Sequence, residues 1–267
     1  MNNQLTRIIL QKQREIEALQ NLLQNQPEHA IAHLLQGKTR RYSVKKFKKA
    51  LRCSYLAIIA EIKRKSPSKG LLAPILDPVS LAMNYIEGGA NAISVLTDEI
   101  FFNGTLRELS SVAFVLEKKP CPILRKDFIL HEIQIAEAIT MGADAILCIV
   151  AILGKKTKAL LAQAKAMGIE VLVEVHNHAE LDIALESDAD IIGINNRDLS
   201  TFQVDTECAL RLVEHIPSSI VKVAESGILV PKLARDYYQA GFDAVLIGEA
   251  LVKSASPSDF MKACRHD

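Results

Sequence analysis

GGANAISVL at 88–96, MGADAILCI at 141–149 and AGFDAVLIG at 240–248 are copies of one pattern, and SDADIIGIN at 187–195 is a weaker copy. In each strong copy a glycine is placed to end a helix in the left-handed conformation, Asn or Asp follows in the turn, and an apolar strand begins. The four apolar runs begin at 91, 144, 190 and 243, so they are 53, 46 and 53 residues apart. Each interval fits two strand–helix units, which predicts a fold of repeated units.

Eight short apolar runs carry the strand signal, and segments with helical periodicity separate them. The runs begin near residues 55, 91, 122, 144, 170, 190, 220 and 243. Runs that are apolar on both faces suit the strands of a parallel sheet covered by helices. Eight such units predict an α/β protein with a closed (βα)8 TIM barrel. The main alternative is an open doubly wound sheet, but the G-x-G-x-x-G motif of that fold is absent after the first run of this sequence.

The chain is expected to form one domain, with a helical extension at 1–54 packed on a barrel at 55–267. Apolar residues from Leu5 to Leu23 recur at near-helical spacing, which predicts a first helix. Pro27 suits the first turn of a second helix. The extension is therefore predicted to be part of the folded unit and not a linker.

The end of this extension, KTRRYSVKKFKKALR at 38–52, holds eight Lys or Arg and no acidic residue. Val44, Phe47 and Leu51 are spaced to share one helix face. We expect an amphipathic helix with a solvated basic face. Local attraction of an anionic substrate and binding of nucleic acid are the alternatives.

Composition limits the partners and the compartment. The formal net charge is +1, so nothing favours a nucleic acid or an anionic membrane as the main partner. The chain shows neither a secretion signal nor an apolar run of about 18 residues, so it is expected to stay in the cytosol. Because the chain ends at Asp267 soon after the eighth unit, no fused second enzyme is expected. Its five cysteines show no C-x-x-C pair and are expected to be reduced. The protein is expected to be a monomer, which is the default for barrels of this kind.

Polar side chains end five of the eight apolar runs, at the edge where TIM barrels build their active sites. Ile59, Glu61 and Lys63 alternate along the first run, so they share one face. The polar groups at the other run ends are Arg125, Lys126 and Asp127, then Glu174, then Asn195, Asn196 and Arg197, then Glu225 and Ser226. Any one group alone could be structural, but together they supply donors and acceptors for carbonyl chemistry.

A phosphate site is expected after the seventh and eighth runs, where barrels often bind this group. Ser226 and Gly227 follow the seventh run, and Gly248 and Glu249 follow the eighth. Glycine allows close backbone approach to an oxyanion, although each could also be a plain turn residue. Glu249 could serve only through its amide, with its carboxylate directed away. The loop at 63–70 could be a solvated turn or a charged lid.

His176 and His178 follow the fifth run with i, i+2 spacing and have no evident Cys or His partner. A metal site is therefore the weaker interpretation, and a role in the loop or at the start of a helix is preferred.

The stretch IIAEIKRKSPSKG at 58–70 resembles the signature of the indole-3-glycerol phosphate synthase family. Further matching stretches follow in the family's order, namely GGANAISVLTDEIFFNG, LRKDFIL, GADAILCIVAIL, VLVEVHNHAEL, IIGINNRDLSTFQVD, VAESGI and LIGEAL. The resemblance spans about 55–253. It implies a cofactor-free and metal-free enzyme of tryptophan biosynthesis. Its substrate, 1-(2-carboxyphenylamino)-1-deoxyribulose 5-phosphate, closes a ring, loses carbon dioxide and then loses water.

By this resemblance, Lys126 looks like the general acid and Lys63 a second acid or an anchor for anions. Glu174 is similar to the carboxylate that stabilises the cationic intermediate, with Glu61 as its partner. The remaining expected catalytic residues are Asn195 and Glu225. The expected substrate-binding residues are Ser66, Arg197, Ser226, Gly227, Gly248 and Glu249, with Phe101 and Phe128 against the aromatic ring or in the core.

Two other functions stay open at this point. Another phosphosugar barrel, an isomerase or a Schiff-base aldolase, would also place a lysine such as Lys126 at a strand end. A non-catalytic barrel could instead use the basic segment at 38–52 as a binding surface.

Overall fold

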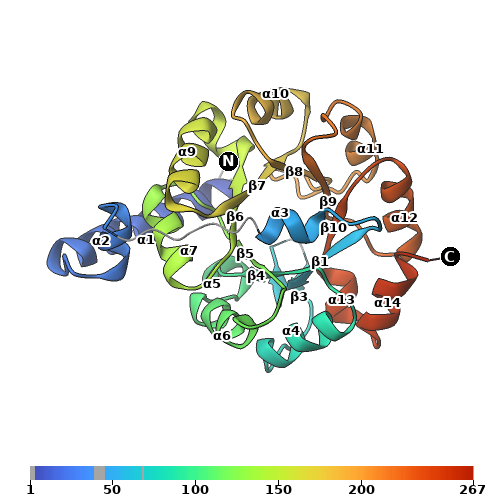
Figure 1. Ribbon diagram of the computed structural model, residues 1–267, viewed down its shortest axis with the longest axis horizontal. Helices are drawn as coiled ribbons and strands as arrows, with labels where there is room; N and C mark the ends of the chain where they lie inside the picture. Colours follow the sequence, from blue (N-terminus) through green and yellow to red (C-terminus); the bar gives the residue numbers. More distant parts are fainter. Residues whose placement is uncertain (1–3, 39–45, 68, 267) are drawn as a thin grey trace.

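Eight parallel strands close into a barrel in the computed structural model, which describes residues 4–38, 46–67 and 69–266 (Figure 1). The strands pair in the order β1, β10, β9, β8, β7, β6, β5, β4 and back to β1. They are β1 (Ala57–Ile62), β4 (Ala92–Leu96), β5 (Ile123–Lys126), β6 (Ala145–Ile149), β7 (Glu170–Val175), β8 (Ile191–Asn195), β9 (Val221–Glu225) and β10 (Ala244–Ile247). The predicted (βα)8 barrel is confirmed.

A ring of helices covers the outside of the barrel (Figure 1). These helices are α4 (Pro78–Glu87), α6 (Leu106–Leu116), α7 (Glu132–Thr140), α9 (Thr157–Met167), α10 (His178–Glu186), α11 (Glu207–Val213), α12 (Pro231–Gln239) and α14 (Pro257–Ala263). Short elements follow the carboxyl ends of several strands, namely β2 (Lys65–Ser66), β3 (Gly70–Leu71), α5 (Glu99–Phe102), α8 (Val150–Leu153), η1 (Gly154–Lys156) and α13 (Glu249–Lys253). The sequence pattern did not predict the short elements, which are too brief to show a period.

The turns before three strands confirm the glycine prediction. Gly89, Gly142 and Gly241 have φ of +96°, +87° and +97°, in the left-handed region. In the weaker copy of the pattern Asp188 takes this role with φ +58°. Asp is among the few other residues that adopt this conformation readily.

Alternation along each strand decides what faces the inside of the barrel. Ala57 and Ile59 of β1 belong to the apolar cluster within the barrel, and Ile58 and Ala60 to the cluster under the helices. The inner cluster fills the barrel from the first residues of the strands up to Leu124, Ile149, Leu172, Val223 and Leu246. On β5, β7 and β9 the next inward position carries a charged side chain, namely Lys126, Glu174 and Glu225.

The extension before the barrel covers both of its ends. Helix α3 (Lys46–Leu51) lies across the end seen from the front in Figure 1. Phe47 and Leu51 are fully buried there against the first inward residues of the strands. Helix α1 (Gln4–Asn25) lies behind the barrel in this view and reaches the opposite end, and α2 (Ala30–Leu35) packs on α7.

The position of α3 decides between the interpretations of the basic segment for the residues that the structure describes. Lys48 pairs with Asp190 and Arg52 with Asp243, both just before strands, at the amino ends. An amphipathic helix with a basic outer face is thus confirmed for Lys46–Leu51. The alternative that this helix attracts an anionic substrate is wrong, because the helix lies at the amino ends of the strands and the cavity lies at their carboxyl ends. The part of the prediction that falls on 39–45 lies outside the described residues.

The second helix starts later than predicted. Pro27 lies in a turn, and His29 caps α2 by accepting from the backbone N–H of Ile31 at 3.2 Å. The helix starts at Ala30 because the His29 side chain accepts a hydrogen bond from a backbone N–H of the first turn that would otherwise be unpaired. None of the described helices combines the length and the apolar character needed to span a bilayer.

Candidate active site

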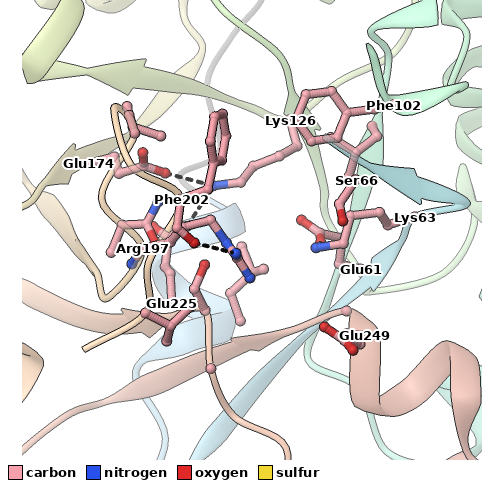
Figure 2. Close-up of a pocket in the computed structure, with 18 of the residues that line it drawn as sticks. Glu61, Lys63, Ser66, Phe102, Lys126, Glu174, Arg197, Phe202, Glu225 and Glu249 are labelled. Atoms are coloured by element: carbon pink, nitrogen blue, oxygen red, sulfur yellow. Dashed lines mark hydrogen bonds and ion pairs between the residues drawn. The ribbon is translucent and has the colours of Figure 1, made fainter. Parts of the chain in front are cut away.

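A cavity of about 360 Å³ opens at the carboxyl ends of the barrel strands. Figure 2 shows side chains converging on it from opposite sides, with Glu174, Arg197 and Glu225 facing Lys63, Ser66 and Phe102. The predicted site residues that line it are Glu61, Lys63, Ser66, Lys126, Phe128, Glu174, Asn195, Arg197, Glu225, Ser226, Gly227, Gly248 and Glu249. Of the fourteen predicted positions, Phe101 alone is missing from this set.

Lys126, the last residue of β5, lies at the centre of the polar wall (Figure 2). Its Nζ donates to Glu174 Oε2 at 2.9 Å and to Glu225 Oε2 at 2.5 Å. The two carboxylates follow Leu172 on β7 and Val223 on β9 by two positions, so alternation turns them inward. Strands far apart in sequence thereby place one ammonium group between two carboxylates.

Lys126 and its two partners have pKa values shifted in different directions. Burial disfavours the charge on Lys126, yet Glu174, Glu225 and Glu61 outweigh it and hold the pKa of Lys126 above its ordinary value. Burial also opposes the charge on Glu174, but Lys126 and His176 outweigh it and lower the pKa of Glu174. For Glu225 burial prevails, reinforced by repulsion from Glu174 and Glu61, and raises its pKa to about 7. Lys126 therefore lies between one carboxylate that stays ionised and one that titrates near neutral pH.

Glu61 and Lys63 form a second ion pair on the opposite wall, with Lys63 Nζ 2.6 Å from Glu61 Oε1. Gly248, at the end of β10, lies directly against this pair. A Cβ at Gly248 would come within 2.4 Å of Glu61 Oε1 and 3.2 Å of Lys63 Nζ. Glycine is needed here because any larger residue would displace the carboxylate.

Sequence reasoning did not single out Gly193 of β8, which has the same relation to Glu225. A Cβ at Gly193 would come within 2.0 Å of Glu225 Oε1. An isolated glycine within a strand is the signal of such a close approach.

Asn195 and Arg197 lie at the end of β8 and in the loop after it. Asn195 Oδ1 accepts from the backbone N–H of Arg197 at 3.0 Å, and Arg197 Nη1 donates to the carbonyl oxygen of Phe202 at 3.1 Å. The Arg197 side chain is thereby held across the cavity (Figure 2). Phe202 and Val204 of this loop also line the cavity, although neither was predicted as a site residue.

The expected phosphate end of the cavity has an unusual backbone. Ser226 and Gly227 have φ of +64° and +79°, so two successive residues are left-handed after β9. Such a turn directs neighbouring N–H groups toward one side and suits an oxyanion. Across from it, Glu249 Oε1 accepts from Lys69 and Lys253, both at 2.8 Å. Its carboxylate is thus paired with two lysines, in line with the prediction that only its amide could serve an anion.

The apolar wall corrects one prediction and adds two residues. Phe102, and not Phe101, lines the cavity, with its ring centroid 6.0 Å from that of Phe128. Phe101 is buried in the inner apolar cluster, because successive residues of the short helix α5 point in different directions. Leu5 and Ile8 of α1 complete this wall.

The two histidines after β7 have the structural places that were preferred for them. His178 begins α10, and His176 lies between Glu174 and Glu180. Within 4–38, 46–67 and 69–266, the side chains of His, Cys, Asp and Glu form no group of three or more that could hold a metal ion.

Solved structures with low sequence identity share this fold. Thiamine phosphate pyrophosphorylase from Pyrococcus furiosus superposes with a TM-score of 0.59 at 17% identity, over 80% of this chain and 95% of that one. At this identity the likeness supports the barrel alone.

Sequence comparison is far more specific. The family model for indole-3-glycerol phosphate synthase matches residues 5–264. The indole-3-glycerol phosphate synthase of Thermoanaerobacter pseudethanolicus is 42% identical over 265 residues, 98% of each chain. That of Mycolicibacterium vanbaalenii is 47% identical over 209 residues, 78% of this chain and 76% of the relative. On a match of this extent, the chain belongs to the indole-3-glycerol phosphate synthase family.

Proposed function

We propose that the cavity around Lys126 carries out the family's decarboxylating carbon–carbon lyase reaction, which forms the indole ring in tryptophan biosynthesis. The main support for this proposal is the position of Lys126 Nζ, which lies 2.9 Å from Glu174 Oε2 and 2.5 Å from Glu225 Oε2. A cation between two carboxylates, in a cavity lined by both charged and apolar side chains, suits a substrate that is part aromatic and part phosphosugar. Family membership also decides against the other phosphosugar barrels and a non-catalytic barrel.

Ring closure requires a proton at the ketone oxygen of 1-(2-carboxyphenylamino)-1-deoxyribulose 5-phosphate as the ring carbon attacks. Lys126 is the proposed donor because its neighbours keep it protonated, with a pKa above its ordinary value. The same charge makes it a poor amine nucleophile, which argues against a Schiff base. Lys63, paired with Glu61, is placed to anchor the carboxylate that leaves as carbon dioxide.

The intermediate before loss of carbon dioxide is a dearomatised cation. Glu174 is the proposed stabiliser, because Lys126 and His176 lower its pKa and keep it ionised. Dehydration then needs a proton for the leaving hydroxyl and a base for a proton of the adjacent ring carbon. Glu225 suits proton exchange in this step, since its pKa of about 7 allows both forms.

The remaining lining residues position the substrate in this proposal. Backbone amides at Ser226, Gly227, Gly248 and Glu249 bind the phosphate, with Ser66 and Arg197 as further anion contacts. The aromatic ring packs on Phe102 and Phe128, and Asn195 orients a substrate hydroxyl. A cytosolic location, a monomeric state and activity without metal or cofactor stay predictions.

The test is indole fluorescence with the carboxyphenylamino substrate, in the presence of a chelator. We expect turnover in the wild type and a loss of about 10² to 10⁴ in kcat for Lys126→Ala and for Glu174→Gln. Both variants should keep the circular dichroism and cooperative unfolding of the wild type. Lys165→Ala on α9 and Glu117→Gln after α6, both exposed, are matched controls.

Two outcomes would contradict this assignment. Full activity of Lys126→Ala or Glu174→Gln would show that the residue has no part in the chemistry. Substrate binding without turnover in the wild type would show that the proposed steps are wrong for this chain.

A further inference from the structure

His176 contacts Glu174 but does not line the cavity. It follows Glu174 by two residues at the end of β7, its side chain is 9% exposed, and it is outside the set of residues that line the cavity. Its Nε2 is 3.4 Å from Glu174 Oε1, the carboxylate oxygen that Lys126 does not use. His176 and Lys126 therefore contact different oxygens of one carboxylate.

The other side of the His176 ring is held by Glu180 in the first turn of α10. Glu180 Oε2 lies 2.8 Å from His176 Nδ1 and accepts from the His176 backbone N–H at 2.9 Å. Glu180 Oε1 accepts from Asn177 Nδ2 at 2.7 Å, and its backbone N–H donates to Asn177 Oδ1. Asn177 caps the helix and fixes the carboxylate that the imidazole meets.

This geometry favours a protonated His176. Glu180 Oε2 accepts the backbone N–H of His176 and lies 2.8 Å from Nδ1, which suits a proton on Nδ1. His176 Nε2 makes no hydrogen bond among the described residues, but at 3.4 Å from Glu174 Oε1 an unprotonated Nε2 would direct its lone pair at a carboxylate, which favours the imidazolium. Burial opposes this charge, but Glu174 and Glu180 outweigh it and raise the pKa of His176 to about 10.

The result is a line of alternating charges that leads from the helix surface into the cavity. It runs through Glu180, His176, Glu174, Lys126 and Glu225, each in contact with the next. From α11, Cys208 reaches His176 only by donating its thiol to the backbone oxygen at 3.2 Å. Within the described part of the chain, the charged side chains that pair with the imidazole are Glu174 and Glu180.

We propose that His176 is a positioning residue of the reaction, whose imidazolium holds Glu174 ionised and turns the other oxygen of Glu174 toward Lys126 and the substrate. This inference rests on the role of Glu174 given under Proposed function. Because His176 does not touch the cavity, its loss should lower kcat and leave KM nearly unchanged. Loss of the imidazolium also removes a stabiliser of the carboxylate, so the pKa of Glu174 should rise.

The first experiment reads the charge of His176 without catalysis. Nitrogen-15 NMR of the imidazole groups in the full-length protein would assign His176 by the signal that disappears in His176→Gln. We expect both ring nitrogens of His176 to be protonated at pH 8, and the midpoint of titration to fall in Glu180→Gln. A neutral ring at pH 7 in the wild type would overturn the proposal.

The second experiment compares His176→Gln with His178→Gln, the same change two residues away at an exposed position. For His176→Gln we expect kcat to fall about tenfold, KM to stay within about twofold, and the acidic limb of the kcat profile to move up by about one pH unit. His178→Gln should match the wild type. An unshifted profile with wild-type kcat in His176→Gln would overturn the proposal.

Glu174→Gln separates this inference from the function on which it rests. If Glu174→Gln is inactive and His176→Gln is normal, only the role of His176 is wrong. If Glu174→Gln is fully active, the proposed function fails first.

Discussion

Lys126 and Asp127 are neighbours in sequence, but they belong to two different buried ionic clusters. The site cluster comprises Glu61, Lys63, Lys126, Glu174 and Glu225. The anchor cluster comprises Lys12, Asp98, Arg125, Asp127 and Glu137. Lys126 faces into the barrel and Asp127 faces helix α1, because successive residues at a strand end point to opposite sides.

The anchor cluster ties α1 to the barrel. Lys12 Nζ lies 3.0 Å from Asp98 Oδ2 and 2.9 Å from Asp127 Oδ1, after β4 and β5. Arg125 pairs with Asp127 at 3.0 Å and with Glu137 of α7 at 2.9 Å. Burial opposes the charge on Asp127, yet Arg125 and Lys12 outweigh it and lower the pKa of Asp127. The shifted pKa values of this cluster, those of Lys12, Arg125 and Asp127, all favour the charged form.

The carboxylates of the site cluster are about as deeply buried as Asp98 and Asp127, but they are less completely paired. Burial of charged groups therefore does not by itself mark an active site. The difference lies in Glu225, whose Oε1 has neither a hydrogen bond nor an ion pair among the described residues and whose pKa shifts toward the neutral form.

The largest expected effects are a loss of stability, which both clusters should share when their central lysine is removed, and a loss of kcat, which separates them. Lys12→Met removes one partner of two buried carboxylates and should cost about 3–5 kcal/mol, which lowers Tm by about 6–20 °C. At a temperature where the variant is folded, kcat should stay near that of the wild type. Lys126→Met also removes the cation between two buried carboxylates, so it should lower Tm as well, but it should in addition abolish activity in the folded protein.

Thermal unfolding and steady-state kinetics on the same samples measure both quantities. A large fall in kcat for folded Lys12→Met would contradict separate roles for the two clusters, because it would show that the anchor cluster is also needed for catalysis.

The next effect concerns pH. The ordinary pKa of Glu225 is 4.5 and its folded value is about 7, so between these values the folded protein binds more protons than the unfolded chain. The stabilising contribution of Glu225 is therefore complete at low pH and is lost as pH rises toward 7. Relative to the wild type, Glu225→Gln should gain stability between pH 5 and pH 8, as measured by urea unfolding.

Asp127→Asn provides the opposite sign from the anchor cluster. Its folded pKa is lowered from 3.8, so the contribution of Asp127 is present at neutral pH and is lost in acid. A difference between Glu225→Gln and the wild type that stays constant from pH 5 to pH 8 would contradict the assignment for Glu225.

The fold and most of the site could be predicted because both depend on local periodicity. Apolar runs mark strands, a barrel brings their carboxyl ends together, and alternation turns Glu61, Lys126, Glu174 and Glu225 inward. The starts of the eight runs lie within two residues of the observed strands.

What the sequence did not predict depends on contacts between distant segments. Lys12 is an ordinary charged residue of an amphipathic helix until α1 docks against Asp98 and Asp127. Leu5 and Ile8 are likewise ordinary apolar residues of this helix, and they line the cavity only because α1 docks there. No local pattern encodes where a helix from the extension meets a barrel loop.

The smallest expected effect distinguishes two adjacent aromatic residues, Phe101 of the inner apolar cluster and Phe102 of the cavity wall. Phe102→Leu removes a flat surface from the proposed ring site and should raise KM about two- to tenfold, with Tm nearly unchanged. Phe101→Leu should leave KM unchanged and lower stability by about 1 kcal/mol, because it alters packing in a closed core. Steady-state kinetics and thermal unfolding of the pair give the answer directly. If KM rose in Phe101→Leu and not in Phe102→Leu, helix α5 would have to rotate on substrate binding, and the apolar wall described above would belong to the free protein alone.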